Sequence, residues 1–159
     1  MPAKSNLYHG PAGEHAVMSE LLWRGWNVAI PQVDIGDDIF VVEDEQGTFY
    51  RVQVKMATGT DTSYGCSAQY TLPLQQLRTP KTPGLIYILA LRFDGKWQDY
   101  LIVDRSTLLS KYEEKNMGSE SDSQLTLYVQ YRKETVECSN SDLTEFCNNW
   151  ARFFPSLPQ

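Results

Sequence analysis

The first clear pattern along the chain is a run of apolar residues at helical spacing within residues 11–25. The apolar positions are Val17, Met18, Leu21 and Leu22. Their period predicts a helix with one buried face. Pro11 and Gly25 are typical of a helix start and a helix stop, which sets the expected bounds. Glu14 falls on the apolar face near the N-terminal end, whereas Glu20 points away from it toward solvent.

The pattern then changes to short strands separated by polar turns. A strand over residues 26–30 ends at Pro31, and a hairpin follows, with strands 38–42 and 48–55 on either side of the polar turn EDEQG. Residues 85–92 form a continuous apolar run, which is typical of a strand buried on both faces. Further strands are predicted over 66–74, 97–103, 125–131 and 135–138, a short helix over 106–115, and loops over 58–65 and 116–123, the second of them mobile.

A last helix is predicted from about Ser141, with Glu145 in a capping-box position. Its apolar stripe would comprise Leu143, Phe146, Cys147, Trp150 and Phe153, and Pro155 lies just past its end. The order is therefore a helix, a mixed run of strands and a helix. This order predicts an α/β fold with a central mixed β-sheet flanked by helices. The length of 159 residues predicts a single domain over residues 1–159.

The hairpin brings polar residues together on one face of the sheet. If its turn has no bulge, Glu43 pairs with Thr48 and Asp38 lies directly opposite Gln53, with their Cβ atoms about 5 Å apart. Lys55 is two residues beyond Gln53 and shares this face.

Arg51, Phe49, Phe40 and Val42 share that face too, and Asp37 is expected on the opposite one. A single bulge would bring Asp37 forward in place of Asp38.

Because Phe40 and Val42 continue this face, we expect another element to cover it, and Lys55 then needs a partner, since a buried ammonium without one is costly. We expect the helix with Glu14 to provide this cover. Two carboxylates with an amide oxygen suit a hard divalent cation such as Mg²⁺ or Mn²⁺. Asp38 is the first candidate ligand, and the Gln53 side chain, the Val54 carbonyl and Glu14 are the others. Lys55 would orient a water molecule and stabilise charge on a phosphate.

Charge and composition limit this picture. The formal net charge of −6 argues against DNA binding by bulk electrostatics, although acidic residues that hold a cation add to the negative count. Three cysteines without CxxC pairing predict reduced thiols, and two histidines, His9 and His15, are too few for a histidine-rich metal site. The longest apolar stretch, residues 85–91, is too short to cross a membrane, and no secretory signal begins the chain. We therefore expect a soluble cytoplasmic protein without a membrane partner.

Three segments carry a resemblance to a known superfamily. They are GEHAVMSELLWRGW, PQVDIGDDIFVVE and TFYRVQVKMA. Together, over roughly residues 10–58, they resemble the PD-(D/E)XK nucleases, which include restriction endonucleases, Holliday-junction resolvases and some homing endonucleases. The likeness is strongest to bacterial branches that read GE, GxD and QVK at these places. The resemblance implies a restriction endonuclease-like fold.

The resemblance implies Glu14, Asp38, Gln53 and Lys55 as the active-site set of a DNA endonuclease that requires Mg²⁺ or Mn²⁺. Two features depart from the usual pattern. Gln53 stands where the superfamily usually has Glu or Asp, and no proline directly precedes Asp38. Many nucleases of this superfamily dimerise to cut two strands, so a homodimer or higher homo-oligomer is expected.

Two other interpretations remain open. The chain could be a catalytically silent nuclease-fold module that binds nucleic acid or a protein partner, or a small α/β interaction domain without nuclease ancestry. Asp34 and Asp37 could form a solvated acidic turn. Tyr64 is the candidate for stacking on a base, and Arg78 and Lys81 are candidates for contacting phosphate. Trp150, Phe153 and Phe154 are expected in the core, with a subunit interface as the alternative.

Overall fold

The computed structural model describes residues 4–158 of the chain. Helix α1 spans Lys4–Trp23, so it begins before Pro11 and not at it, which corrects the predicted start. A proline removes one helical N–H, but here the helix continues through it. Leu22 is 54% exposed and does not belong to the buried face, because it lies one residue beyond the buried Leu21 and points to solvent. The end of the helix before Gly25 agrees with the prediction.

The first sheet contains the predicted hairpin and the long apolar strand. Its strands are β1 (Asn27–Ala29), β2 (Ile39–Val42), β3 (Phe49–Thr58), β6 (Leu85–Phe93) and β7 (Lys96–Asp104), in the order β1-β2-β3-β6-β7. Strands β3 and β6 run parallel and the other neighbours run antiparallel. The sheet is therefore mixed, as predicted. The position of β6 between β3 and β7 explains its apolar sequence, because a central strand is covered on both faces.

The predicted register of the hairpin is confirmed. Ile39 pairs with Val52, and Val42 pairs with Phe49. The Asp38 N–H donates to the carbonyl of Val52, the residue that pairs with Ile39, at 2.9 Å, so the regular pairing does not continue to Asp38. Asp38 lies just outside the paired residues and contacts Gln53 through its side chain.

A second, antiparallel sheet was not expected. Its strands are β4 (Thr60–Thr62), β5 (Gly65–Pro73), β8 (Ser119–Ser121), β9 (Gln124–Arg132), β10 (Val136–Cys138) and β11 (Ser141–Asp142), with β9 between β5 and β10. Residues 58–65 and 116–123, both predicted as loops, instead contain β4 and β8. Strand β8 pairs with β9, so the segment predicted to be mobile is held in a hairpin. Both faces of β4 and β8 are exposed and carry polar side chains, so these strands lack the alternation of apolar and polar residues that predicts a strand.

The predicted C-terminal helix is wrong. Ser141 pairs with Cys138 in a strand, and two short 3₁₀ turns follow, Thr144–Phe146 and Trp150–Arg152. Asn148 has a φ of 53°, which no α-helix accommodates, and its side chain holds the Tyr100 N–H at 2.9 Å. The predicted apolar residues are nevertheless largely buried, so burial was predicted correctly while the helical period was not.

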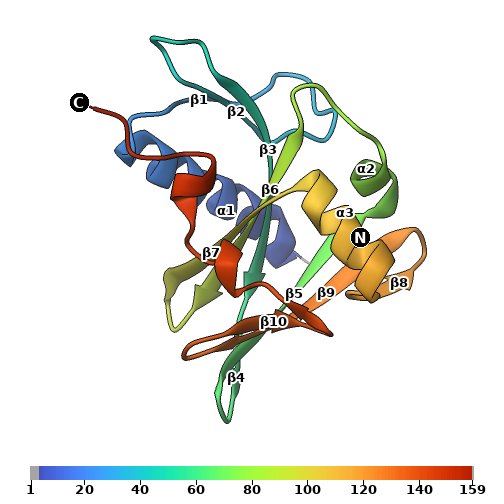
Figure 1. The fold of residues 1–159 in the computed structure, drawn as a ribbon. Coiled ribbons are helices and arrows are strands. Elements are labelled where there is room, and N and C mark those ends of the chain that lie inside the picture. The colour runs from blue at the N-terminus through green and yellow to red at the C-terminus, as the bar shows by residue number, and fades with distance from the viewer. Residues whose placement is uncertain (1–3, 159) are drawn as a thin grey trace.

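The first sheet separates two apolar clusters. Helix α1 and the C-terminal segment cover the face that carries Val52 and Val54, and Phe154 is fully buried there. The second sheet, helix α2 (Leu74–Arg78) and helix α3 (Arg105–Lys115) cover the other face. Figure 1 shows α1 and the red C-terminal segment on one side of β3 and β6, with α2 and α3 on the other. The predicted α/β class, a mixed sheet flanked by helices, is confirmed.

No helix within the described residues is both long enough and apolar enough to cross a membrane.

Candidate active site

The candidate site lies where β3 loses its neighbour. Strand β2 begins at Ile39, so β3 beyond Gln53 has no β2 residue beside it. The Asp38 side chain replaces the missing strand, because its Oδ2 accepts the Val54 N–H at 2.7 Å. The N–H and C=O of one strand residue point to the same side, so the Val54 carbonyl also faces this open edge. It accepts a long bond of 3.3 Å from Gln53 Nε2.

Asp38 and Gln53 contact each other directly across this edge. Gln53 Nε2 donates a short hydrogen bond to Asp38 Oδ2. Burial raises the pKa of the Asp38 carboxyl above its ordinary value, and the Val54 N–H and the nearby Lys55 oppose this shift. The carboxylate is thus partly removed from water and held by two donors. A second positive charge at this place would stabilise its ionised form.

Glu14 reaches the same edge from helix α1. A Cβ on Gly13 would lie 2.7 Å from the Cβ of Met56, so only glycine lets the helix approach β3 this closely. The approach sets Glu14 beside the strand residue that precedes Met56. Burial raises the pKa of Glu14, and the neighbouring Asp38 carboxylate raises it further, while His15 and Lys55 oppose the shift. Glu14 is therefore close enough to Asp38 and Lys55 for their charges to act on its carboxyl.

The positive charge of Lys55 acts on the carboxyl groups of both Glu14 and Asp38. It lowers the pKa of both Glu14 and Asp38. Its side chain is half-buried, and in the described part of the chain its ammonium makes no hydrogen bond or ion pair. Its hydrogen-bond donors therefore remain available to a ligand at the open edge.

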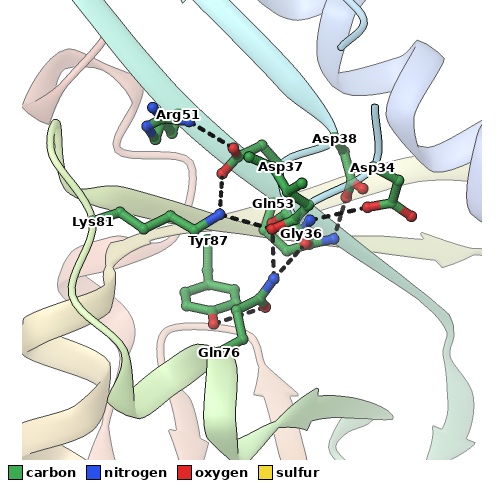
Figure 2. A network of polar contacts seen from close by, with 10 residues as sticks. Asp34, Gly36, Asp37, Asp38, Arg51, Gln53, Gln76, Lys81 and Tyr87 are labelled. Carbon is green, nitrogen blue, oxygen red and sulfur yellow. Dashed lines mark hydrogen bonds and ion pairs between the residues drawn. The ribbon is translucent and has the colours of Figure 1, made fainter. Parts of the chain in front are cut away.

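The expected cover of the Gln53 face by α1 is wrong. Alternation along β3 places Val52 and Val54 toward α1, so Gln53 points to the opposite side. There Gln76 of α2 donates from Nε2 to Gln53 Oε1 at 2.8 Å. Tyr87, which pairs with Gln53 on β6, donates its hydroxyl to Gln76 Oε1 at 2.9 Å. Figure 2 shows these side chains in one connected network.

Asp37 does not lie on the face opposite to Gln53, which corrects the prediction. It precedes β2, so strand alternation does not apply to it, and it turns toward Arg51 and Lys81 (Figure 2). Its side chain is fully buried, with Arg51 Nη1 at 2.8 Å and Lys81 Nζ at 2.9 Å. Asp37 is therefore a structural ion-pair centre and not part of a solvated turn. Asp34 is exposed and accepts the Gly36 N–H at 3.0 Å, as a solvated turn requires.

The remaining candidates lie in different surroundings. Tyr64 is 78% exposed in the turn between β4 and β5. The Arg78 guanidinium bonds the Tyr112 hydroxyl at 3.3 Å and lies over its ring. Lys81, considered for phosphate contact, is instead engaged by Asp37 and the Ile35 carbonyl. Trp150 and Phe154 are buried in the core, as expected, and Phe153 packs against it half-buried.

Sequence reasoning missed Gln76 and Tyr87. Gln76 lies between the strands predicted over 66–74 and 85–92, where the pattern predicts no element, and Tyr87 lies within the apolar run that forms β6. The only signals were a glutamine pair in the segment LPLQQL and a hydroxyl within an otherwise aliphatic strand. Because buried hydroxyls usually find a partner, Tyr87 was the stronger signal of the two.

The donor set fits a hard divalent cation. Among residues 4–158, no three His, Cys, Asp or Glu side chains lie close enough to enclose a metal by themselves. Mg²⁺ is commonly held by one or two carboxylates while waters and substrate phosphates complete its shell. Asp38, Glu14 and the Val54 carbonyl meet that requirement, and the raised pKa of both carboxyls is the condition that a cation would relieve. The Gln53 oxygen faces Gln76, so as oriented it does not point to this place.

Comparisons with known proteins concern the family and the fold. A family profile described as PD-(D/E)XK endonuclease matches residues 5–80, which include all of the candidate site residues from Glu14 to Gln76. Among solved structures, the fold is similar to that of a bacterial homing endonuclease, I-Ssp6803I, with a TM-score of 0.57 and 14% sequence identity over 97% of this chain and 93% of the other. No curated protein matches the sequence. The profile match over residues 5–80 and the similarity in fold to an endonuclease together support assignment of this chain to the PD-(D/E)XK nuclease family.

Proposed function

We propose that the protein is a metal-dependent endonuclease that hydrolyses phosphodiester bonds in DNA. One observation carries the proposal: the Asp38 carboxylate binds the Val54 N–H at the open edge of β3, near enough to Glu14 and Lys55 for these charges to affect one another. Two desolvated carboxyls beside an ammonium that has no hydrogen bond or ion pair among residues 4–158 are hard to explain as packing, because buried charges are usually paired. A bound cation would give the two carboxylates a positive partner, and the phosphate of a phosphodiester would give the ammonium a negative one.

In this proposal Asp38, Glu14 and the Val54 carbonyl hold Mg²⁺ or Mn²⁺. When bound, the cation supplies positive charge that polarises a phosphate oxygen. The residues of the chain do the rest. Gln53 and the Val54 N–H hold the Asp38 carboxylate in place from two directions.

Lys55 donates hydrogen bonds to the attacking water and to the phosphate oxygens, where negative charge grows in the transition state. Its position next to both carboxylates orients that water toward the phosphorus.

DNA is the proposed partner because the family profile names endonucleases and the structurally similar protein is a homing endonuclease. The negative net charge means that binding depends on the cation and on a few local cations of the chain more than on the overall field. Tyr64, exposed in its turn, is proposed to stack on an exposed base.

The test is cleavage of supercoiled plasmid, linear duplex, single strand and branched junction with Mg²⁺ or Mn²⁺. Wild type, Lys55→Ala and Lys96→Ala are compared, since Lys96 is an exposed lysine on β7 and serves as the matched control. We expect cleavage by wild type and Lys96→Ala, none with EDTA, and a loss of at least 100-fold in Lys55→Ala, about the value of one transition-state donor. Far-UV circular dichroism checks that each variant is folded.

Absence of cleavage on every substrate would overturn the proposal. The alternative function is a catalytically silent module that binds nucleic acid or protein, and one observation favours it: Gln76 occupies the Gln53 oxygen at 2.8 Å. Binding of the same DNA substrates without cleavage, measured by mobility shift, would support that alternative.

A further inference from the structure

The amide of Gln53 has only one orientation that satisfies its neighbours. On one side it meets the Asp38 carboxylate and the Val54 carbonyl, which accept hydrogen bonds and cannot donate them. On the other side it meets Gln76. The NH₂ group of Gln53 therefore faces Asp38, and its oxygen faces Gln76.

The orientation of Gln76 is set independently. Its Nε2 donates to the Gly36 carbonyl at 2.8 Å, and this group also accepts only. Its Oε1 accepts from the Tyr87 hydroxyl. Turning Gln76 over would place two oxygens against each other at Gly36. The same Nε2 reaches Gln53 Oε1 at 2.8 Å, so the direction set at Gly36 passes to Gln53.

The Gly36 carbonyl is itself held in place from both sides. Lys81 Nζ bonds the carbonyl of the preceding residue, Ile35, at 2.9 Å and the carboxylate of the following residue, Asp37, at 2.9 Å. Gly36 has a φ of +89°, and a Cβ there would lie 2.5 Å from Gln76 Nε2. Both the conformation and the space require glycine, and Figure 2 shows Gln76 directly beneath it.

We propose that Gln76 is a positioning residue that locks Gln53 as a hydrogen-bond donor to Asp38. Gln53 then orients the carboxylate from its flank and contributes no oxygen to the cation. This inference rests on the proposed function for its consequence in metal binding, and its geometric part concerns the protein alone. It gives a reason for an amide at a position where the superfamily usually has a carboxylate: a carboxylate has no NH₂ with which to hold Asp38.

The first measurement follows hydrogen exchange of the Gln53 side-chain NH₂ by NMR on ¹⁵N-glutamine-labelled protein without metal. We expect this NH₂ to be protected in wild type and to lose protection in Gln76→Met, which has a side chain of similar size but no amide. Tyr87→Phe is the matched control, because it removes the hydroxyl from the far side of Gln76 and leaves the Gln76 NH₂ intact. We expect it to keep the protection. Equal protection in wild type and Gln76→Met would overturn the proposal.

The second measurement titrates the same proteins with Mg²⁺ and follows binding by calorimetry and the Gln53 side-chain carbonyl carbon by NMR. We expect the Gln53 NH₂ to stay protected at saturation. Half-saturating Mg²⁺ should rise roughly 10- to 100-fold in Gln76→Met, as for other outer-shell partners of metal ligands. The double variant with Gln53→Met should bind no more weakly than Gln53→Met alone, because Gln76 acts through Gln53.

A large shift of the Gln53 carbonyl carbon on Mg²⁺ binding, with loss of NH₂ protection, would contradict the proposal because the oxygen would then face the cation. If wild type binds no Mg²⁺, the proposed function fails, and the exchange comparison without metal still decides whether Gln76 locks Gln53. The two failures are therefore distinguishable.

Discussion

Asp37 and Asp38 are neighbours in the sequence but differ in their contacts: Asp37 forms buried ion pairs, whereas Asp38 lies at the open edge of β3. The Asp37 side chain is 0% exposed and holds Arg51 and Lys81 at 2.8 and 2.9 Å. Asp37→Asn removes the charge and keeps the shape. It leaves two cations, each with 20–23% of the side chain exposed, without their counter-ion.

Breaking a buried ion pair by removing one partner costs about 3–5 kcal/mol. The two cations keep some contact with water, so we expect Asp37→Asn near the lower end, about 3 kcal/mol. For a chain of this size each kcal/mol shifts the melting temperature by about 2–4 °C, which predicts a fall on the order of 10 °C. Lys81→Met should cost less, about 1–2 kcal/mol, because Arg51 still neutralises Asp37.

The assay is thermal and urea unfolding followed by circular dichroism, with the exposed Asp61→Asn as control, for which we expect a change within about 0.5 kcal/mol. A buried pair is screened little by salt, so the difference should persist in 1 M NaCl, about the concentration at which surface pairs are screened within 3 Å. A melting temperature for Asp37→Asn equal to that of Asp61→Asn would refute the structural role of Asp37.

Three further predictions follow from burial and pKa. Phe154→Ala should destabilise the protein by about 3–5 kcal/mol in urea unfolding, because the ring is 0% exposed between Trp26 and Tyr50; a loss under about 1 kcal/mol would show that the C-terminal segment packs loosely. All three cysteines are free, and burial, together with the Asp99 carboxylate, raises the pKa of the Cys147 thiol to about 12. The native protein should therefore react more slowly with iodoacetamide at neutral pH than the unfolded chain does. Rapid labelling of Cys147 in the native protein would contradict this prediction. The pKa values of Glu14 and Asp38 in the folded protein are raised above their ordinary values of 4.5 and 3.8, so without metal the free energy of unfolding should decrease as pH rises from these ordinary values through the folded ones. Over the same pH range, Mn²⁺ affinity measured by calorimetry should increase, because the ligands lose their protons. An affinity independent of pH would exclude these carboxyls as ligands.

The sequence predicted the parts of the site that depend on local pairing. The length of one hairpin turn predicts the register, which the structure has from Ile39 to Val42, and the Asp38 and Gln53 side chains meet just beyond its end. Glu14 was placed correctly on the buried side of its helix, although the helix covers the other face of β3. The approach of Glu14 to β3 depends on the close contact between Gly13 and Met56. This contact joins distant segments and could not be predicted from the sequence pattern.

The parts that failed depend on contacts between distant segments. Gln76 contacts Gln53 because the fold brings α2 next to β3. A helix of five residues is too short for its apolar spacing to predict that contact. The C-terminal apolar spacing suited a helix, but Ser141 and Asn148 are claimed by β10 and by Tyr100, so tertiary hydrogen bonds prevailed over helix propensity. Asp37 escaped strand alternation because the ladder begins after it.

The central claim is that Asp38, and not Asp37, serves metal-dependent cleavage of DNA. The most direct test compares plasmid cleavage by Asp37→Asn and Asp38→Asn with wild type in Mg²⁺, at a temperature well below the melting point of each variant. We expect Asp37→Asn to keep most of its activity while folded, and we expect Asp38→Asn to retain its fold and lose cleavage. Full activity of Asp38→Asn, or loss of activity confined to folded Asp37→Asn, would contradict the assignment of this site.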